Sequence, residues 1–284
     1  MPGSKLLTRI HEISHKAALD SVAVAFYDYE TSVRFALRGD RPFHAASTFK
    51  AAVLLGVLKA VEAGQIRLDD RLQVRNRFLS IVDGSPYRIE RSRDADTTVH
   101  RAIGASMSIR ELSEVMVVRS SNLATNLLMD LIGVDFVREF LDEEGVSGVD
   151  VKRGVEDQLA HERGINNEVT AEGLVRFYRL IVADHFLPTE LRDEALRILS
   201  AQEFNNMIPA KLPKGTRIAH KTGEISTHCH DAGIVYPQNR QPYVGAILTE
   251  HGPQATKRNR AVAEISGAIY RYLVGGHGEE KPAA

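Results

Sequence analysis

The hydrophobic positions near the N-terminus first recur with a helical period and then alternate. Apolar side chains every three or four residues over 6–18 predict a helix. Alternation over 22–26 and over 33–37, around a turn at 29–31, predicts an antiparallel hairpin with one buried face. The sequence Gly-Asp-Arg-Pro at 39–42 ends this hairpin.

The middle of the chain returns to helical periods. From Ser47 to about Ala63 the residues are apolar nearly all round, which predicts a helix in the interior. A polar, poorly periodic stretch follows over 69–104, and Ser108 and Glu111 then match a capping box that opens helical sequence to about Val118. Further helices are expected over 123–132, ending at Gly133, over 172–187 and, after Pro188, over 190–199.

The C-terminal part returns to alternation and closes with a helix. Strands are expected over 217–222, 232–236 and 243–249, with a turn at 237–240. A final helix is expected from about Thr256 to Val274, and the tail 275–284 is expected to be disordered.

This order of elements predicts an α/β (α+β) fold in which both groups of strands join one five-stranded antiparallel sheet. The terminal helices would cover one face of the sheet, and the helical middle would form a second lobe. Residues 1–46 and 206–284 are assigned to the sheet lobe and 47–205 to the helical lobe. Because sites commonly lie in the crevice between such lobes, we expect the functional residues there.

Composition and charge narrow the function classes. Of the 284 residues 43% are apolar and 26% are charged, and the net charge is −1. Such a chain has no basic field for nucleic acid and no polybasic segment for an anionic membrane. The single cysteine, Cys229, cannot form an intramolecular disulfide, which permits a reducing compartment.

No segment of the chain predicts export or membrane insertion. The N-terminal residues lack the apolar run of a secretory signal. The longest apolar stretch, 51–61, contains Lys59 and is too short to span a bilayer. The chain is expected to be cytoplasmic as it stands, or periplasmic or secreted if a signal peptide was removed. Its oligomeric state is left open.

The first candidate for chemistry is Ser47-Thr48-Phe49-Lys50, at the start of the buried helix. A serine and a lysine three apart share a helix face, so a neutral Lys50 can take the proton of Ser47 and make it a nucleophile. The apolar run 51–55 disfavours the ammonium form. The alternative is a helix cap followed by a solvent-facing lysine.

Two further short motifs carry groups of the same chemistry. Ser120-Ser121-Asn122 lies between helical runs, where Ser120 can relay a proton and Asn122 can bind a substrate carbonyl and hold Lys50. The alternative is a polar turn with a cap.

Lys221-Thr222-Gly223 ends a predicted strand. Lys221 offers a charge to a carboxylate, Thr222 a hydrogen bond, and Gly223 allows close approach. The alternative is an ordinary strand end at the surface.

The three motifs occur once each, in this order. The set is typical of class A β-lactamases and penicillin-binding proteins. The chain resembles class A β-lactamases, and more loosely all penicillin-recognising serine enzymes, over nearly its whole length, most closely at Ala46-Ser47-Thr48-Phe49-Lys50. The resemblance implies a β-lactamase/transpeptidase-like fold, and no cofactor is expected.

The resemblance implies a role for each residue of the motifs. Ser47 would be acylated, with Lys50 as its general base or part of the proton network, and Ser120 would protonate the leaving nitrogen. The oxyanion hole would use the backbone N–H groups of Ser47 and Glu224.

On the substrate side, Asn122 would bind the amide, and Lys221 and Thr222 the carboxylate, next to Gly223. Glu224 departs from the family pattern, since its acid lies beside the substrate channel, and no arginine lies on the following strand.

A loop after the helical middle resembles the class A loop whose glutamate activates the deacylating water, with Glu156 in that role. The match is partial. Asp157 replaces the family proline, Ala160 replaces an asparagine that helps hold the water, and Arg153 lies one residue too far upstream. In the second motif Ser121 replaces the usual aspartate.

Histidines on the second predicted strand group suggest another chemistry. His228 and His230 would share a strand face, and with Asp231 beside them a zinc site is conceivable. Two histidines without distant partners fit a pocket or surface better, so no metal is expected.

The sequence therefore predicts a serine hydrolase that acts through an acyl-serine, with β-lactams as substrate. The alternatives are a D-alanyl carboxypeptidase or esterase on the same machinery, or a penicillin-binding sensor that stays acylated. Glu224 and the imperfect loop around Glu156 favour these alternatives.

Overall fold

The computed structural model describes residues 3–183, 185–255 and 257–275. Its α-helices are α1 (Ser4–Lys16), α2 (Lys50–Glu62), α3 (Thr98–Arg101), α4 (Ile109–Val118), α5 (Asn122–Ile132), α6 (Val134–Glu143), α7 (Gln158–Glu162), α8 (Ala171–Val182), α9 (Thr189–Ser200) and α10 (Arg258–Val274). Two 3₁₀ turns are η1 (Arg91–Arg93) and η2 (Ile208–Lys211). The strands are β1 (Ser21–Asp28), β2 (Arg34–Leu37), β3 (Phe43–His44), β4 (Arg71–Gln73), β5 (Phe78–Leu79), β6 (Pro86–Tyr87), β7 (Ser106–Ser108), β8 (Val149–Asp150), β9 (Glu168–Val169), β10 (Arg217–Ile225), β11 (His228–Tyr236) and β12 (Tyr243–Glu250).

A five-stranded antiparallel sheet of order β10-β11-β12-β1-β2 forms the centre of the molecule. The N-terminal hairpin and the three C-terminal strands meet where β1 pairs with β12, from Ser21 opposite Glu250 to Asp28 opposite Tyr243. The expected fold class, with both strand groups in one sheet, is confirmed.

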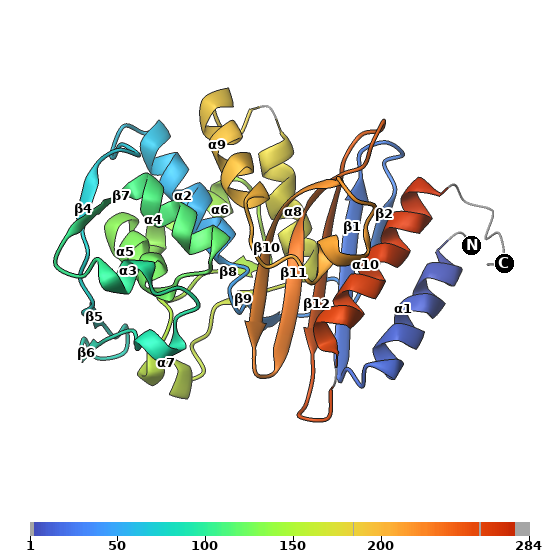
Figure 1. Cartoon of the computed structure of the whole chain (residues 1–284), viewed down its shortest axis with the longest axis horizontal. Helices are drawn as coiled ribbons and strands as arrows, with labels where there is room; N and C mark the ends of the chain where they lie inside the picture. Colours follow the sequence, from blue (N-terminus) through green and yellow to red (C-terminus); the bar gives the residue numbers. More distant parts are fainter. Residues whose placement is uncertain (1–2, 184, 256, 276–284) are drawn as a thin grey trace.

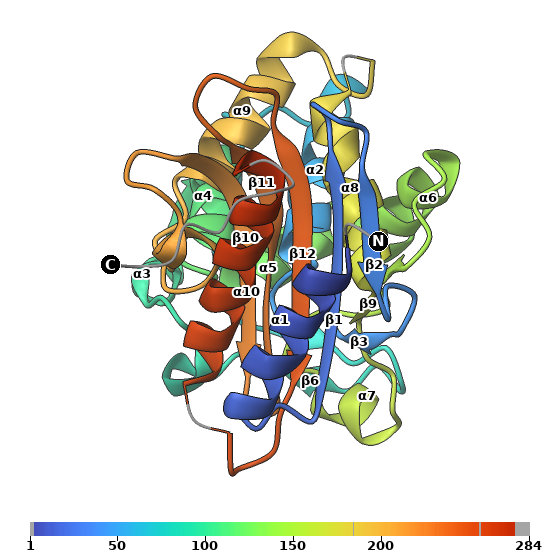
Figure 2. The ribbon, with the colours of Figure 1, turned by 90° about the vertical axis from the view of Figure 1, so that its right-hand side faces the viewer.

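Helices cover both faces of this sheet (Figure 1). The terminal helices α1 and α10 lie against one face, as the view onto that face also shows (Figure 2). On the other face α8 packs on β1 and β12, and beyond it α4, α5, α6 and α9 surround α2. Within the described ranges, no helix is both long and apolar enough to cross a membrane.

The local signals in the sequence explain most helix boundaries. At the start of α4, the Ser108 hydroxyl accepts from the N–H of Glu111, and the Glu111 carboxylate accepts from the N–H of Ser108, so the predicted capping box is confirmed. Helix α2 is buried on nearly every side, as its pattern predicts.

One expected helix end was wrong, and the helix α6 was not expected. The expected end of the helix over 123–132 at Gly133 (φ 83°) is confirmed, since α5 ends at Ile132, but the next residues form α6, whose buried face is Val137, Phe140 and Leu141. The helix expected to reach 187 ends at Val182, because Phe186 and Leu187 are apolar for burial in the core rather than for helical packing. Thr256 and the tail 276–284 lie outside the described residues.

Strand β10 is longer than expected and ends at Ile225, so Lys221-Thr222-Gly223 lies inside the strand rather than at its end. The cause is the neighbouring strand β11, which begins at His228 and pairs with β10 along its whole length. The ladder of backbone hydrogen bonds keeps these residues extended, although their own sequence has no alternating pattern.

A buried ion pair closes the turn between β11 and β12. The guanidinium of Arg240 donates to both carboxylate oxygens of Asp28, at 2.6 and 2.7 Å, and to the carbonyl of Leu273 at 2.7 Å. The Asp28 side chain is fully buried at the end of β1. The pair therefore links the turn to both β1 and α10.

Replacing Arg240 by alanine should lower the free energy of unfolding by about 3–5 kcal/mol, because Asp28 would stay buried without its cation. The matched control is the exposed pair of Arg260 and Glu264 on α10. Arg260→Ala should cost about 0.3–0.5 kcal/mol. Urea denaturation of both variants measures the difference, and equal losses would contradict the prediction.

Candidate active site

Ser47 lies in a turn that leads into α2, rather than in the helix itself. The helix begins at Lys50, whose N–H donates to the carbonyl of Ser47 at 3.3 Å. Ala46, just before the serine, has a φ of 48°, so the chain bends sharply there. Among the described hydrogen bonds, none uses the N–H of Ser47. This bend places Ser47 on the wall of a pocket of about 240 Å³.

Lys50 is fully buried one turn after Ser47. Its amine donates to the Ser120 carbonyl at 2.6 Å, to the Ser120 hydroxyl at 3.3 Å and to Asn122 Oδ1 at 2.8 Å. Burial lowers the pKa of Lys50 to about 7, against the opposing charges of Asp94 and Glu156. A lysine of this pKa is partly neutral at neutral pH and can accept a proton.

A second buried lysine approaches the same hydroxyl from the sheet. Lys221 Nζ donates to Ser120 Oγ at 3.2 Å and to the Thr222 carbonyl at 3.0 Å. Burial, and then repulsion by Lys50, hold the pKa of Lys221 well below its usual range. The Ser120 hydroxyl thus lies within reach of two amines, which forms a short path for protons.

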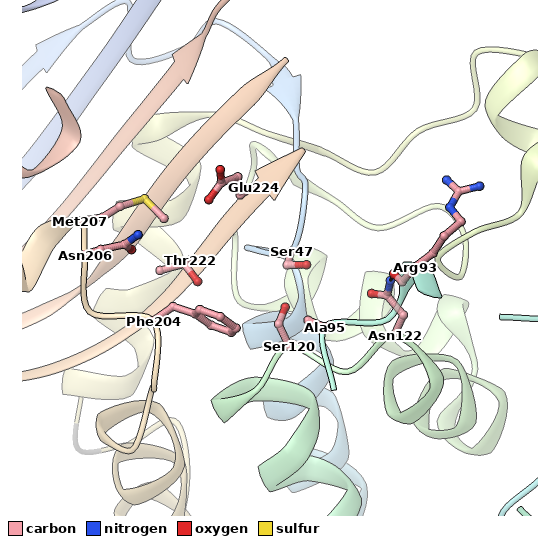
Figure 3. Close-up of a pocket in the computed structure, with 10 residues that line it drawn as sticks. All are labelled: Ser47, Arg93, Ala95, Ser120, Asn122, Phe204, Asn206, Met207, Thr222 and Glu224. Carbon is pink, nitrogen blue, oxygen red and sulfur yellow. Dashed lines mark hydrogen bonds between the residues drawn. The ribbon is translucent and has the colours of Figure 1, made fainter. Parts of the chain in front are cut away.

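The pocket lies where the turn before α2, the start of α5 and the strand β10 meet (Figure 3). Ser47 lies between the strand β10 on one side and the residues near the start of α5 on the other. Gly223 packs against the turn of the serine, where a Cβ would lie 2.9 Å from the backbone nitrogen of Ser47. The lining residues are Ser47, Arg93, Ala95, Ser120, Asn122, Phe204, Asn206, Met207, Thr222 and Glu224.

The carboxylate of Glu224 at the pocket wall is paired, which the sequence did not reveal. Arg258, in the first turn of α10, donates to Glu224 Oε1 at 3.0 Å, and Asn259 donates to Oε2 at 3.2 Å. An arginine therefore reaches the end of β10 from the C-terminal helix, although none lies on the following strand. Its positive charge offsets the acid beside the pocket.

Glu156 lies near Lys50 but makes its ion pair elsewhere. Its carboxylate accepts from Arg93 Nη2 at 2.8 Å, and its side chain is 19% exposed. The residue has a φ of 61°. Its loop is pinned to α5 by Asn126, which bonds both the N–H and the carbonyl of Val155. The negative charge of Glu156 nevertheless acts on Lys50.

The departures around Glu156 have structural roles. Asp157 caps α7 through the N–H of Ala160 at 3.1 Å and also accepts from the Ser80 hydroxyl. Arg153 donates to the carbonyl of Ile165 at 2.6 Å, which closes the loop on itself. These contacts hold the loop in the absence of the family proline.

The histidines of β11 lie away from the pocket. His230 is fully buried between the carbonyl of His44, at 3.0 Å, and the N–H of Thr249. Burial lowers the pKa of His230 to about 3, so it stays neutral. Asp231 contacts His220 instead, at 2.9 Å. In the part of the chain that the structure describes, no group of three or more histidine, cysteine or acidic side chains is placed to hold a metal.

Two residues of the site came from stretches without a usable pattern. Arg93 and Asp94 belong to the polar region 69–104, and nothing in its periodicity singles them out. Their charge is the only signal in the sequence, and the burial of Asp94 becomes visible only in the structure.

Comparisons with known proteins identify the family of the chain. The model of the beta-lactamase enzyme family matches residues 5–273. A β-lactamase of Streptomyces fradiae is 28% identical over 264 residues, which cover 91% of this chain and 82% of that protein.

Solved structures share the fold. An acyl-enzyme complex of a PBP-A variant with penicillin G is 26% identical, with a TM-score of 0.78 over 94% of each chain. A β-lactamase structure from Xanthomonas campestris, 23% identical, has a TM-score of 0.83 and covers 96% of this chain and 99% of its own. With the family match over nearly the whole length, the chain belongs to the beta-lactamase enzyme family.

Proposed function

We propose that this protein hydrolyses the amide bond of β-lactams through an ester on Ser47. The observation that carries the proposal is the pair of buried lysines, Lys50 and Lys221, which both donate to the hydroxyl of Ser120. Ser120 and Ser47 line the same pocket. A nucleophile beside a buried proton path is the arrangement that acyl transfer requires.

In the acylation step, neutral Lys50 accepts the proton of Ser47 as the serine oxygen attacks the carbonyl carbon. The N–H groups of Ser47 and Glu224 hold the oxyanion. Ser120 then donates its proton to the leaving nitrogen as the amide C–N bond breaks, and the adjacent amines restore the proton on Ser120.

Substrate recognition uses the two walls of the pocket. Asn122 and Thr222 line the pocket and face the substrate amide and carboxylate, and the buried Lys221 lies next to Thr222, where its ammonium form attracts the carboxylate. The pairing of Glu224 with Arg258 supports an anionic substrate, because the acid beside the pocket is already neutralised.

In the deacylation step, Glu156 is the base that activates water. Its ion pair with Arg93, and the lack of a side-chain amide at Ala160, favour slow turnover. The second candidate is therefore a penicillin-binding sensor, in which the same acylation occurs and the ester on Ser47 persists.

The division into lobes fits this arrangement. We assign residues 1–46 and 206–284 to the sheet lobe and 47–205 to the helical lobe. The hydrophobic cluster under α1 and α10 draws its members from 6–37 and 207–274 alone. The pocket takes its walls from both lobes, as substrate sites often do.

Mixing the protein with a chromogenic cephalosporin should give sustained colour and a transient adduct in the intact mass, because Ser47 is acylated and then released. Ser47→Ala should give neither, while Ser200→Ala, at the exposed end of α9, should behave as the parent protein. A stable one-to-one adduct would favour the sensor, and an adduct that persists on Ser47→Ala would contradict the role of Ser47.

The rate of acylation should rise as pH increases through about 7, since Lys50 must lose its proton before it can act as a base. Below this pKa the rate should fall about tenfold per pH unit. Lys50→Arg, which stays charged at every accessible pH, should abolish acylation. Stopped-flow measurement of adduct formation tests this, and a flat profile between pH 5 and 9 would exclude Lys50 as the base.

Glu156→Gln should slow deacylation by about 10²–10⁴-fold and leave acylation at its optimum pH nearly unchanged, because the activation of water needs the carboxylate and the attack of Ser47 does not. The acyl-enzyme would then accumulate in the mass spectrum. Glu162→Gln, on the exposed side of α7, is the matched control. Normal turnover by Glu156→Gln would show that another group serves as the base.

A further inference from the structure

We propose that Asp94 is the positioning residue of this active site. It holds the turn Ser120-Ser121-Asn122 and supplies, from another segment of the chain, the carboxylate that this turn lacks. The inference rests on the proposed function for the roles of Ser120 and Asn122. Asp94 lies just after η1, in the region that has no periodic pattern, and nothing in its sequence context marks it out.

The carboxylate of Asp94 contacts three successive residues at the start of α5. Oδ1 accepts from the N–H of Asn122 at 2.8 Å, and Oδ2 accepts from the N–H of Leu123 at 2.9 Å and from the Ser121 hydroxyl at 3.2 Å. The first N–H groups of a helix have no partner within the helix, and a negative charge there is favoured by the helix dipole. Asp94 thus caps α5 from outside.

A second set of contacts fixes Asp94 in place. His100, from α3, lies 3.1 Å from Oδ2, and the N–H of Asp96 donates to Oδ1 at 3.4 Å. The Asp94 side chain is fully buried and that of His100 is 6% exposed. A buried charge is tolerated when it is hydrogen-bonded in this way. The carboxylate is therefore a fixed anchor rather than a mobile surface acid.

The anchored turn presents the reactive groups. Ser120 has a φ of 58°, a conformation that costs a non-glycine residue about 1 kcal/mol or more and persists only under restraint. Asn122 is held at three points, since its N–H bonds Asp94, its Nδ2 donates to the carbonyl of Arg93 at 3.1 Å, and its Oδ1 accepts from Lys50. Loss of Asp94 would release both side chains.

Asp94 also acts on Lys50 by charge. The charged groups that act on this lysine are Asp94 and Glu156, which raise its pKa, and Lys221, with which it shares Ser120. Glu156 is in turn paired with Arg93. Removing the charge of Asp94 disfavours the ammonium form, so the pKa of Lys50 falls further below its usual value. A residue that only stabilised the fold would not have this effect.

The test is Asp94→Asn, which keeps the shape and removes the charge. We expect acylation at its optimum pH to slow about tenfold to a hundredfold, as misplaced groups do. The acid limb of the pH profile should move to lower pH. Asp28→Asn, at another fully buried aspartate remote from the pocket, is the control that lowers stability without moving the acid limb.

A rescue separates the anchor from general damage. The Ser121 hydroxyl lies 3.2 Å from Oδ2 of Asp94, so Ser121→Asp added to Asp94→Asn returns a carboxylate to nearly the same place. The double variant should recover the acid limb and part of the rate. Lowered stability with an unchanged acid limb in Asp94→Asn, or failure of the double variant to recover either quantity, would overturn the proposal.

A second readout does not depend on the substrate. Titration of Lys50 by NMR, in protein labelled with ¹³C at the lysine Cε, should show a lower pKa in Asp94→Asn than in the parent protein. If the parent forms no adduct with a β-lactam, the proposed function fails while this comparison still tests Asp94. An equal pKa of Lys50 in both proteins would overturn the electrostatic part of the proposal.

Discussion

The burial of one lysine amine is the constraint on which the site depends. Lys50 is carried into the interior by α2, which is apolar on nearly every side, and an amine there must find polar partners. It finds them in Ser120 and Asn122, at the junction of α4 and α5. The same contacts that satisfy the amine bring the polar turn between α4 and α5 beside Ser47, and the burial of the amine lowers the pKa of the lysine.

The sheet completes this arrangement from the other side. Pairing of β10 with β11 places Lys221 against Ser120, and Gly223 against the turn that carries Ser47. Two amines then share one hydroxyl in a space where neither is well solvated. Their mutual repulsion adds to the burial and favours loss of a proton from the pair. The chemistry is thus a property of the contact between sheet and helices.

Charges that look unfavourable in the sequence are compensated across the fold. Glu224 pairs with Arg258 of α10, and Glu156 pairs with Arg93 of η1. Ser121 has no charge of its own, and Asp94 supplies one at the start of α5. In each case the partner comes from a segment distant in the sequence. Each altered residue of the motifs can therefore be interpreted only together with the charged partner that compensates for it.

The sequence by itself determined the five-stranded sheet and the interior helix after Ser47, because strand alternation and helical period record which side chains are buried. It also determined the capping box at Ser108, which depends on residues three apart. It did not determine the end of β10, since the ladder with β11 and not the residues' own pattern keeps that strand extended. Only the tertiary structure decided which charges meet Glu224, Glu156 and Ser121, because those partners are fixed by chain packing over long separations and leave no periodic trace in the sequence.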